Sequence, residues 1–289
     1  MNGIIIIDKP SGWTSHDVVG KLRGILKERR IGHSGTLDPM ATGILPVFIG
    51  RATRAVEFCE SADKEYIAGL HTGIVTDTQD ITGTVLETNN VTITSDDIKG
   101  ILPQFLGEQE QVPPMYSAIK INGQKLYELA RRGIDIPRPA RTITIKELEF
   151  LGKTEDGFLI RAVCSKGTYI RTLCHDIGVK LGCGGVMSSL RRTRAGAFTI
   201  DSSVMLEQVS DAVQSGTINR ILMPVDTIFE YPALTIDENQ ARKCRNGAAF
   251  PYPNASNGLY CVYDGSGDFL MLGSMENGTL STVKSFFEV

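Results

Sequence analysis

The chain has 289 residues, of which 42% are hydrophobic, so it is long enough to bury one substantial core and to carry a small second domain. Its first ten residues, "MNGIIIIDKP", have no basic stretch and only four consecutive isoleucines, so they predict a buried strand rather than a signal peptide or a membrane span. The formal net charge of −3 hides an asymmetry, because residues 131–200 carry 13 Lys and Arg against 6 Asp and Glu, whereas residues 201–289 carry 5 against 11.

The six cysteines form no CxxC pair and the four histidines are dispersed, so the sequence predicts neither a metal site nor a disulfide framework. Without a secretion signal, this pattern is typical of reduced thiols in a cytoplasmic protein. The basic segment 131–200 has two interpretations that charge alone leaves open, namely a face for a polyanion and a surface of ion pairs.

In the first half of the chain, predicted strands and helices follow one another irregularly. After the apolar run at residues 4–7, Thr14 or Ser15 is a suitable N-cap for a helix whose apolar residues recur at helical spacing up to the basic run "KERR". Residues 64–87 have the alternation of strands broken by Thr, Asp and Gly turns, and a second helix begins at Ser95. The stretch "AIKINGQKLYELARRG" predicts a strand, an Asn-Gly turn and a short helix closed by glycine.

The second half begins with two predicted strands, at residues 142–151 and 158–165, around an Asp-Gly turn, and a helix follows them. Short strands separated by Asn, Gly and Pro turns occupy the last sixty residues or so. Because strands and helices do not alternate regularly, the pattern indicates an α+β fold. We expect a domain boundary near Tyr231, which gives a large domain at residues 1–230 and a small β-rich domain at residues 231–289.

Several common kinds of site have no support in the sequence. There is no GxxxxGK[ST] phosphate loop, no GxGxxG after a strand, no HExxH and no GxSxG, which argues against nucleotide hydrolysis, dinucleotide redox chemistry and the common hydrolases. Four segments remain that combine charged residues with turns: "DKPSGWTSHD", "RRIGHSGTLDPMATG", "SKGTYIRTL" and "SSLRRTRAG".

Each of these segments also has an ordinary structural interpretation. Lys9 and the backbone N–H groups after it are suited to a phosphate, although a simple turn is the plainer account. Asp38, in a glycine-rich run before a proline, is most simply an acid in a surface turn. Tyr169 and Arg171 would face the same side of a strand, and ion pairing of the arginine is the alternative. The three arginines after Leu190 predict a solvated basic edge strand or a contact with RNA phosphates.

These segments resemble the TruB family of bacterial tRNA pseudouridine-55 synthases, and the resemblance extends over nearly the whole chain. It rests on "IIIIDKPSGWTSHDVV", "RRIGHSGTLDPMATGILPVFIGRATR", "DKEYIAGLHTGIVTDTQD", "QVPPMYSAIKINGQKLYELARRGI", "CSKGTYIRTLCHDIGVKLG" and "MSSLRRTRAGAF". The "GTLDPMATG" core by itself would indicate a wider family that includes guide-RNA-dependent relatives. The last sixty residues match more loosely and resemble a small PUA-like RNA-binding domain.

The resemblance implies a pseudouridine synthase fold with a mixed, mostly antiparallel sheet, and an isomerase that acts on uridine 55 in the T-loop of tRNA. The base is flipped out, its N-glycosidic bond breaks, and carbon 5 joins the same ribose carbon. Nothing is added or removed overall, so we expect no cofactor. We also expect a monomer without an obligatory protein partner, because tRNA itself supplies the large interface.

Asp38 matches the family's catalytic aspartate. Detaching a base gives the sugar positive character, so an ionised carboxylate beside the ribose is useful, as it is in glycosidases. The route stays open between attack on the ribose, addition to the uracil ring and loss of a ribose proton to give a glycal. Arg171 matches the family's partner of this acid, and we expect a salt bridge in which the guanidinium lowers the carboxyl pKa.

Five further residues receive roles from the resemblance. Tyr66 matches the tyrosine that lies against the flipped base, and Tyr169 matches a second residue of that pocket. His33 matches a histidine that enters the RNA loop vacated by the base, and Leu190 matches a residue that contacts the flipped nucleotide, although its sequence context alone predicts a core position. Lys9 supports the active-site loop or a phosphate.

Two functions of other kinds remain open at this point. One is a non-catalytic RNA-binding or tRNA-folding module, in which Asp38 merely closes a turn. The other is a guide-RNA-dependent synthase that needs protein partners, and the absence of long basic tails argues against it. The excess of acidic residues in 201–289 indicates that the C-terminal domain is a structural cap or a weak RNA contact.

Overall fold

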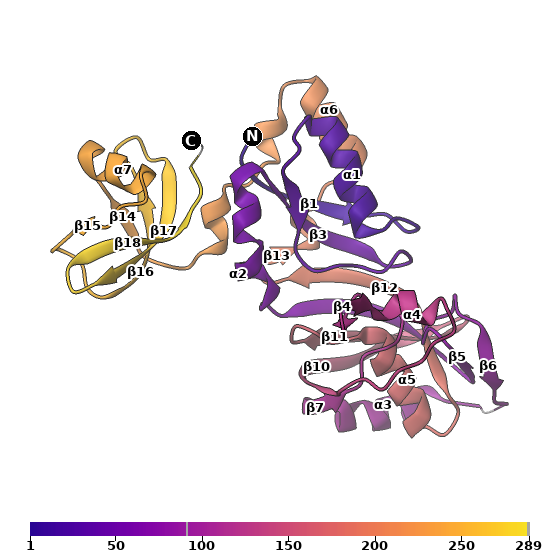
Figure 1. Cartoon of the computed structure of the whole chain (residues 1–289). Helices are drawn as coiled ribbons and strands as arrows, with labels where there is room; N and C mark the ends of the chain where they lie inside the picture. The colour runs from indigo at the N-terminus through magenta and orange to yellow at the C-terminus, as the bar shows by residue number, and fades with distance from the viewer. Residues whose placement is uncertain (91, 288–289) are drawn as a thin grey trace.

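The computed structural model describes residues 1–90 and 92–287, and its largest element is a mixed sheet (Figure 1). Its strands follow the spatial order β1 (Gly3–Lys9), β3 (Thr42–Ile49), β12 (Gly185–Ala195), β4 (Lys64–Thr72), β11 (Gly157–Cys164), β10 (Arg141–Thr154) and β7 (Gly107–Gln111), with β2 (Ile31–His33) beside β3 and β13 (Phe198–Thr199) beside β12. Within the described ranges every neighbouring pair is antiparallel except β12 and β3, which confirms the predicted α+β fold with a mostly antiparallel sheet.

Helices cover both halves of this sheet. The helices α1 (Ser15–Leu26) and α6 (Leu206–Gln214) pack on β1 and β3, and α3 (Ser95–Ile101) and α5 (Ile170–Lys180) pack on β4, β10 and β11. The hydroxyl of Thr14 accepts the N–H of Asp17 and so caps α1, as one of the two predicted N-caps. Helix α3 begins at the predicted Ser95. Two short helices, α2 (Val56–Glu60) and α4 (Leu126–Ala130), lie in connections.

Two small hairpins stand outside the large sheet. One joins β5 (Ile74–Thr76) to β6 (Val85–Thr88), and the other joins β8 (Lys120–Ile121) to β9 (Gln124–Lys125) just before α4. The second is built on the predicted Asn-Gly turn, because Asn122 and Gly123 have φ of 51° and 82°, the left-handed values that this kind of turn requires.

Strand β12 lies in the middle of the large sheet, which corrects the prediction of a solvated edge strand for its arginines. It pairs along its length with β4 and, in parallel, with β3 at Arg191 with Thr42 and Arg192 with Gly43. At Gly43, φ is 98° and a Cβ would lie 2.2 Å from the carbonyl oxygen of Arg192, so only glycine allows the two strands to approach here. This line divides the large sheet into two halves, with β1 and β3 on one side and β12, β4, β11, β10 and β7 on the other.

A smaller sheet follows in the order β14 (Ala233–Thr235), β16 (Gly258–Tyr263), β17 (Phe269–Glu276), β18 (Thr279–Ser285) and β15 (Phe250–Pro251), accompanied by α7 (Glu238–Arg245). It confirms the predicted β-rich C-terminal part of the fold. Phe269 of β17 and Phe286, which directly follows β18, share one hydrophobic cluster with Ile4 and Phe48 of the large sheet. The boundary expected near Tyr231 falls just before β14, and its role as a domain boundary stays a prediction.

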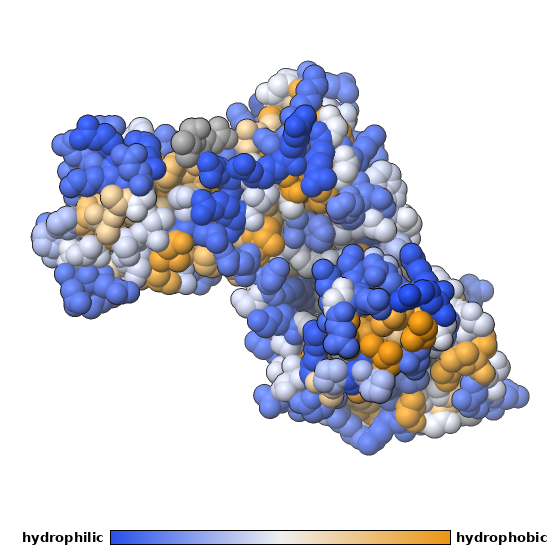
Figure 2. Space-filling model, in the orientation of Figure 1, coloured by the Kyte–Doolittle hydropathy of each residue, from blue (hydrophilic) through white to orange (hydrophobic). Residues whose placement is uncertain are grey.

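Figure 2 shows that hydrophilic residues cover most of one face of the molecule, with separate apolar patches between them. No helix in residues 1–90 or 92–287 is both long and apolar enough to cross a membrane. All six cysteines are free thiols, which confirms the prediction drawn from their spacing.

Candidate active site

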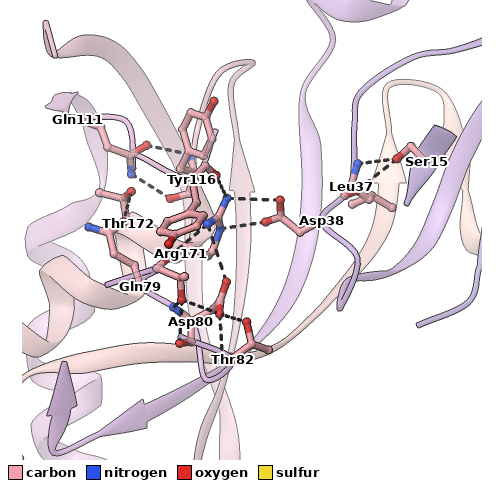
Figure 3. A network of polar contacts seen from close by, with 12 residues as sticks. Ser15, Leu37, Asp38, Gln79, Asp80, Thr82, Gln111, Tyr116, Arg171 and Thr172 are labelled. Carbon is pink, nitrogen blue, oxygen red and sulfur yellow. Dashed lines mark hydrogen bonds and ion pairs between the residues drawn. The ribbon is translucent and has the colours of Figure 1, made fainter. Parts of the chain in front are cut away.

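Asp38 and Arg171, which are far apart in the sequence, meet where the two halves of the sheet join (Figure 3). Asp38 lies in the loop between β2 and β3, and Arg171 lies in the first turn of α5. The Nε of Arg171 is 2.9 Å from Oδ2 of Asp38, and its Nη2 donates to Oδ1 at 3.3 Å. The predicted salt bridge is therefore present, with the two-point geometry that a guanidinium favours with a carboxylate.

The guanidinium of Arg171 is also held on its other sides. Its Nη2 donates to the carbonyl oxygen of Tyr116 at 2.7 Å, and its Nη1 donates to that of Thr78 at 3.1 Å and lies 3.8 Å from Oδ2 of Asp80. Only 5% of the arginine side chain is exposed, against 36% for Asp38. The buried arginine is thus fixed on several sides, and the exposed part of the pair is the carboxylate.

Opposing effects act on the pKa of Asp38. Burial raises the pKa of this carboxyl above its ordinary value, while the guanidinium of Arg171 opposes that rise and the charge of Asp80 adds to it. The Arg171 contribution has the predicted direction, and the effect of burial outweighs it. Desolvation is the larger effect, because the acid sits where the two halves of the sheet close on each other.

The loop that carries Asp38 is braced from β1 and α1. The hydroxyl of Ser15 accepts the N–H of Leu37 at 2.9 Å and donates to its carbonyl oxygen at 3.3 Å (Figure 3). Lys9 donates from Nζ to the carbonyl oxygen of Pro39 at 3.2 Å. These contacts lie on both sides of Asp38 in the sequence, so they fix the backbone from which the carboxylate projects.

Lys9 has no access to solvent, and its ammonium uses all three donors within the chain. Besides Pro39, it donates to the carbonyl oxygens of Pro10 and Trp13 at 2.9 and 2.5 Å. Burial lowers its pKa to about 8, against the opposing attraction of Asp38. Of the two predicted roles, loop support fits these contacts, which use every donor that the ammonium would offer to a phosphate.

Arg192 closes the same loop from the centre of the sheet. Its side chain is 1% exposed, and it donates from Nη2 to the carbonyl oxygen of Gly35 and from Nε to that of Ile44, each at 2.8 Å. The neighbouring Arg191 forms an ion pair with Asp8 at 2.7 Å. Arg192 is thus engaged inside the chain, whereas the side chain of Arg191 is 40% exposed, so a contact of Arg191 with RNA phosphates stays a prediction.

Three of the remaining predicted residues lie near the pair. Tyr169 is the N-cap residue of α5 and not part of a strand, so the prediction that it shares a strand face with Arg171 is wrong. Both residues nevertheless lie at the start of the same helix. Tyr66 on β4 packs against the hydrophobic cluster that contains the 8%-exposed Leu190. Burial raises the pKa of both phenols above the ordinary value, and the negative charge of Asp38 contributes to this rise.

His33 lies apart from these residues, at the end of β2. In the described part of the chain its Nδ1 is buried and has no hydrogen-bond partner. Burial lowers its pKa, and the positive charges of Arg192 and His16 add to this effect, so the imidazole is held neutral. His33 thus directly precedes the loop that carries Asp38, and its contact with RNA stays a prediction.

Three residues that contribute to the site were not singled out from the sequence, namely Asp80, Gln111 and Tyr116. Asp80 is 6% exposed and accepts hydrogen bonds from the hydroxyls of Thr78 and Thr82. The Thr-rich run around it was the available signal, because Thr and Asp side chains bond to one another in tight turns. Tyr116 contributes a backbone carbonyl, which no side-chain pattern reveals.

Comparison with known proteins agrees with this geometry. The N-terminal domain model of the TruB family pseudouridylate synthases matches residues 23–170, and the model of the tRNA pseudouridylate synthase B C-terminal domain matches residues 171–230. The chain belongs to the TruB family. It is therefore an isomerase, since uridine and pseudouridine contain the same atoms. The second match begins at Arg171 and includes β12, so this segment completes the large sheet.

Individual relatives extend the similarity over the whole chain. The tRNA pseudouridine synthase B of Bacillus cereus is 46% identical over 256 residues, which cover 86% of this chain and 83% of the relative. That of Clostridium kluyveri is 41% identical over 292 residues and covers 99% and 100%. Among solved structures, a Cbf5–Nop10–Gar1 complex gives a TM-score of 0.74 at 28% identity, and an H/ACA RNP bound to a substrate RNA gives 0.73 at 26%, each covering 99% of this chain and 85% of that chain.

Proposed function

We propose that this chain converts uridine 55 in the T-loop of tRNA to pseudouridine. The observation that carries the proposal is the two-point Asp38–Arg171 pair, with a partly exposed carboxylate on a braced loop, in a chain 46% identical to a tRNA pseudouridine synthase B. A turn-closing aspartate in a non-catalytic module needs neither a buried arginine nor a loop held from two strands and a helix.

The chemistry follows from what the reacting atoms need. The bond between C1′ of the ribose and N1 of uracil breaks, a bond between C1′ and C5 forms, the proton on C5 leaves, and N1 takes up a proton. Positive character develops on the sugar, so the ionised Asp38 acts beside it, while Arg171 holds that carboxylate charged and oriented against the effect of burial. Attack on the ribose, addition to uracil and the glycal route all begin from this state.

The remaining residues bind the substrate in this proposal. Tyr66 and Tyr169 hold the flipped base by stacking, which contributes on the order of 1–3 kcal/mol per base. Leu190 supplies an apolar contact next to the flipped nucleotide, and His33 enters the space that the base leaves. The raised pKa of Tyr66 keeps its phenol protonated, which suits it to give or relay a proton late in the reaction.

The proposal extends to the organisation of the chain. Residues 1–230 form the catalytic domain and residues 231–289 a PUA-like domain, the enzyme works as a monomer in the cytoplasm, and tRNA is its partner. The hydrophobic cluster shared by the two sheets supports a C-terminal domain that is docked on the catalytic one.

A guide-RNA-dependent synthase is the second candidate, because the similar solved structures include Cbf5 assemblies. The two candidates differ in what the protein needs besides its substrate. A tRNA-specific enzyme acts alone on a T-loop, whereas a guide-dependent enzyme requires a guide RNA and protein partners.

One experiment tests the proposal. Purified protein is incubated, without other proteins or guide RNA, with an unmodified tRNA transcript labelled with tritium at C5 of uridine, and tritium release and the position of pseudouridine are measured. We expect stoichiometric release from one site, uridine 55, and none from a transcript with cytidine at that position. Absence of release would reject the tRNA-specific function, and release that depends on an added guide RNA would favour the second candidate.

A further inference from the structure

Gln111 makes a contact with the start of α5 that no other described residue makes. It is the last residue of β7 and is 4% exposed. Its Oε1 accepts the backbone N–H of Tyr169 at 2.8 Å, and its Nε2 donates to the carbonyl oxygen of Tyr169 at 3.1 Å. One amide side chain thus binds both polar groups of a single backbone residue, as a neighbouring strand would.

This contact lies at a point where the helix needs support. Tyr169 is the N-cap residue of α5, and its own side chain makes no capping hydrogen bond. The carbonyl oxygen of Tyr169 also accepts from the N–H of Leu173 inside the helix, whereas its N–H has Gln111 as its partner. Arg171 follows two residues later, so the side chain of Gln111 fixes the backbone from which the guanidinium projects.

The chain that follows Gln111 reaches the same arginine. Five residues further on, the carbonyl oxygen of Tyr116 accepts from Nη2 of Arg171 at 2.7 Å. The end of β7 therefore controls both the backbone that carries Arg171 and one acceptor of its guanidinium. Both contacts depend on where this strand ends.

We propose that Gln111 is a positioning residue for the reaction: by clamping the backbone of Tyr169, it sets the guanidinium of Arg171 and the ring of Tyr169 against Asp38. The inference rests on the proposed function, because it concerns the same site. Gln111 touches no reacting atom, so its effect passes through the helix.

The test compares Gln111→Met with Gln109→Met. Methionine has nearly the volume of glutamine but forms neither hydrogen bond. Gln109 lies two residues earlier on β7, and its Nε2 donates to the carbonyl oxygen of Phe105, away from the site, so its replacement removes a similar backbone contact from the same strand. The wild-type protein and both variants are measured for kcat, for the Kd of unmodified tRNA and for the pH dependence of kcat.

For Gln111→Met we expect kcat to fall on the order of 10–100-fold, as small misplacements of catalytic groups do, with the Kd of tRNA within about threefold of wild type. The fall of kcat at acid pH (the acid limb of the pH profile) should also move to higher pH, because a displaced Arg171 no longer opposes the rise in the pKa of Asp38 that burial causes. The charged neighbours Asp80 and Lys9 keep their places in this variant. A merely structural role would leave that limb unchanged. Gln109→Met should resemble wild type in all three measurements.

Gln111→Asn keeps an amide that is one methylene shorter, so it tests the same contact if the methionine variant does not fold. It should give a smaller fall in kcat and a shift of the acid limb in the same direction. If the Gln111 variants had kcat values within about twofold of that of Gln109→Met and showed no shift of the acid limb, the inference would be overturned. A wild-type protein that forms no pseudouridine would instead reject the proposed function, so the two failures are distinguishable.

Discussion

Residues 34–41 and residues 112–140 contribute to the same site in opposite ways. The first segment carries Asp38 and is held by buried side chains from three other elements, including Ser15 and Arg192. The second consists of a hairpin and a short helix, exposes Arg131, Arg132 and Ile134 to solvent, and reaches the guanidinium of Arg171 through the backbone carbonyl of Tyr116. The difference indicates that the acid is fixed before substrate arrives, whereas the second segment is available to the RNA.

The charges of residues 131–200 sharpen this contrast. Five of the 13 cations are paired with carboxylates and a sixth is buried, so the net charge of the segment overstates the positive charge that RNA can meet. They are Arg138, Lys146, Arg161, Arg171 and Arg191, which are paired with carboxylates, and Arg192, which is bound to two carbonyls. Arg131 and Arg132 are exposed on the surface. The ion-pair interpretation therefore holds for part of the segment, and a face for a polyanion stays a prediction for the exposed arginines.

Replacing Arg171, the partner of Asp38, should have the largest effect on catalysis. In Arg171→Met the carboxylate loses its partner, and we expect kcat to fall on the order of 10²–10³-fold with little change in tRNA binding, because the interaction acts on the charge that drives the reaction. Arg161→Met is the control, since this arginine pairs with Glu65, Glu147 and Glu149 elsewhere in the sheet. Equal kcat values for the two variants would contradict the account.

The pH dependence should report the protonation of Asp38. Burial raises its pKa, and the reactive form is the carboxylate, so kcat should fall as pH decreases through a value above that of an ordinary aspartate, which is about 3.9. Below that point the rate should drop about tenfold per pH unit. Arg171→Lys keeps the positive charge and should shift the limb upward less than Arg171→Met does. Single-turnover rates between about pH 4 and 8 would show this, and a limb at or below the ordinary value would refute it.

The side chains that hold the Asp38 loop should contribute to the free energy of unfolding. Arg192→Met leaves the carbonyl oxygens of Gly35 and Ile44 without their donor, which should cost about 1–3 kcal/mol of unfolding free energy. The adjacent Arg191→Met removes a partly exposed ion pair and should cost about 1 kcal/mol or less. Urea unfolding of the two variants measures the difference, and similar midpoints would show that Arg192 does not hold the loop.

Substitutions in residues 112–140 should have the smallest effects, and these should appear in tRNA binding. Replacing Arg131 or Arg132 by alanine should weaken tRNA binding a few-fold and reduce the slope of log Kd against log salt by about 1 for each phosphate that the variant no longer neutralises. Lys146→Ala is the control, because its ammonium is paired with Asp63. An unchanged slope in the arginine variants would place the RNA on another face.

Local patterns predicted the parts of the fold that local contacts determine. The cap at Thr14, the helix at Ser95 and the turn at Asn122 each depend on side chains within a few residues, and all three are found. Arg192 was misread because an arginine becomes buried only when distant carbonyls accept its protons, and Ile44 and Gly35 lie far from it in the sequence.

The contacts within the site could not be predicted from local sequence patterns. Asp38 and Arg171 are 133 positions apart, and their pairing was expected from the family resemblance and then found in the structure. The net direction of the Asp38 pKa could not be foreseen, because burial depends on how two halves of a sheet close. Gln111 escaped notice because its partner is the backbone of Tyr169, which has no sequence signature.

The most direct measurement compares wild type with Asp38→Asn on unmodified tRNA, with pseudouridine mapped at single-nucleotide resolution and Kd measured in parallel. Asparagine keeps the size of the side chain and one acceptor for Arg171 but lacks the negative charge. The account predicts complete conversion of uridine 55 by wild type, no detectable conversion by the variant, and tRNA affinities within about threefold of each other. Pseudouridine formed at position 55 by Asp38→Asn would contradict the central claim that this carboxylate is the catalyst.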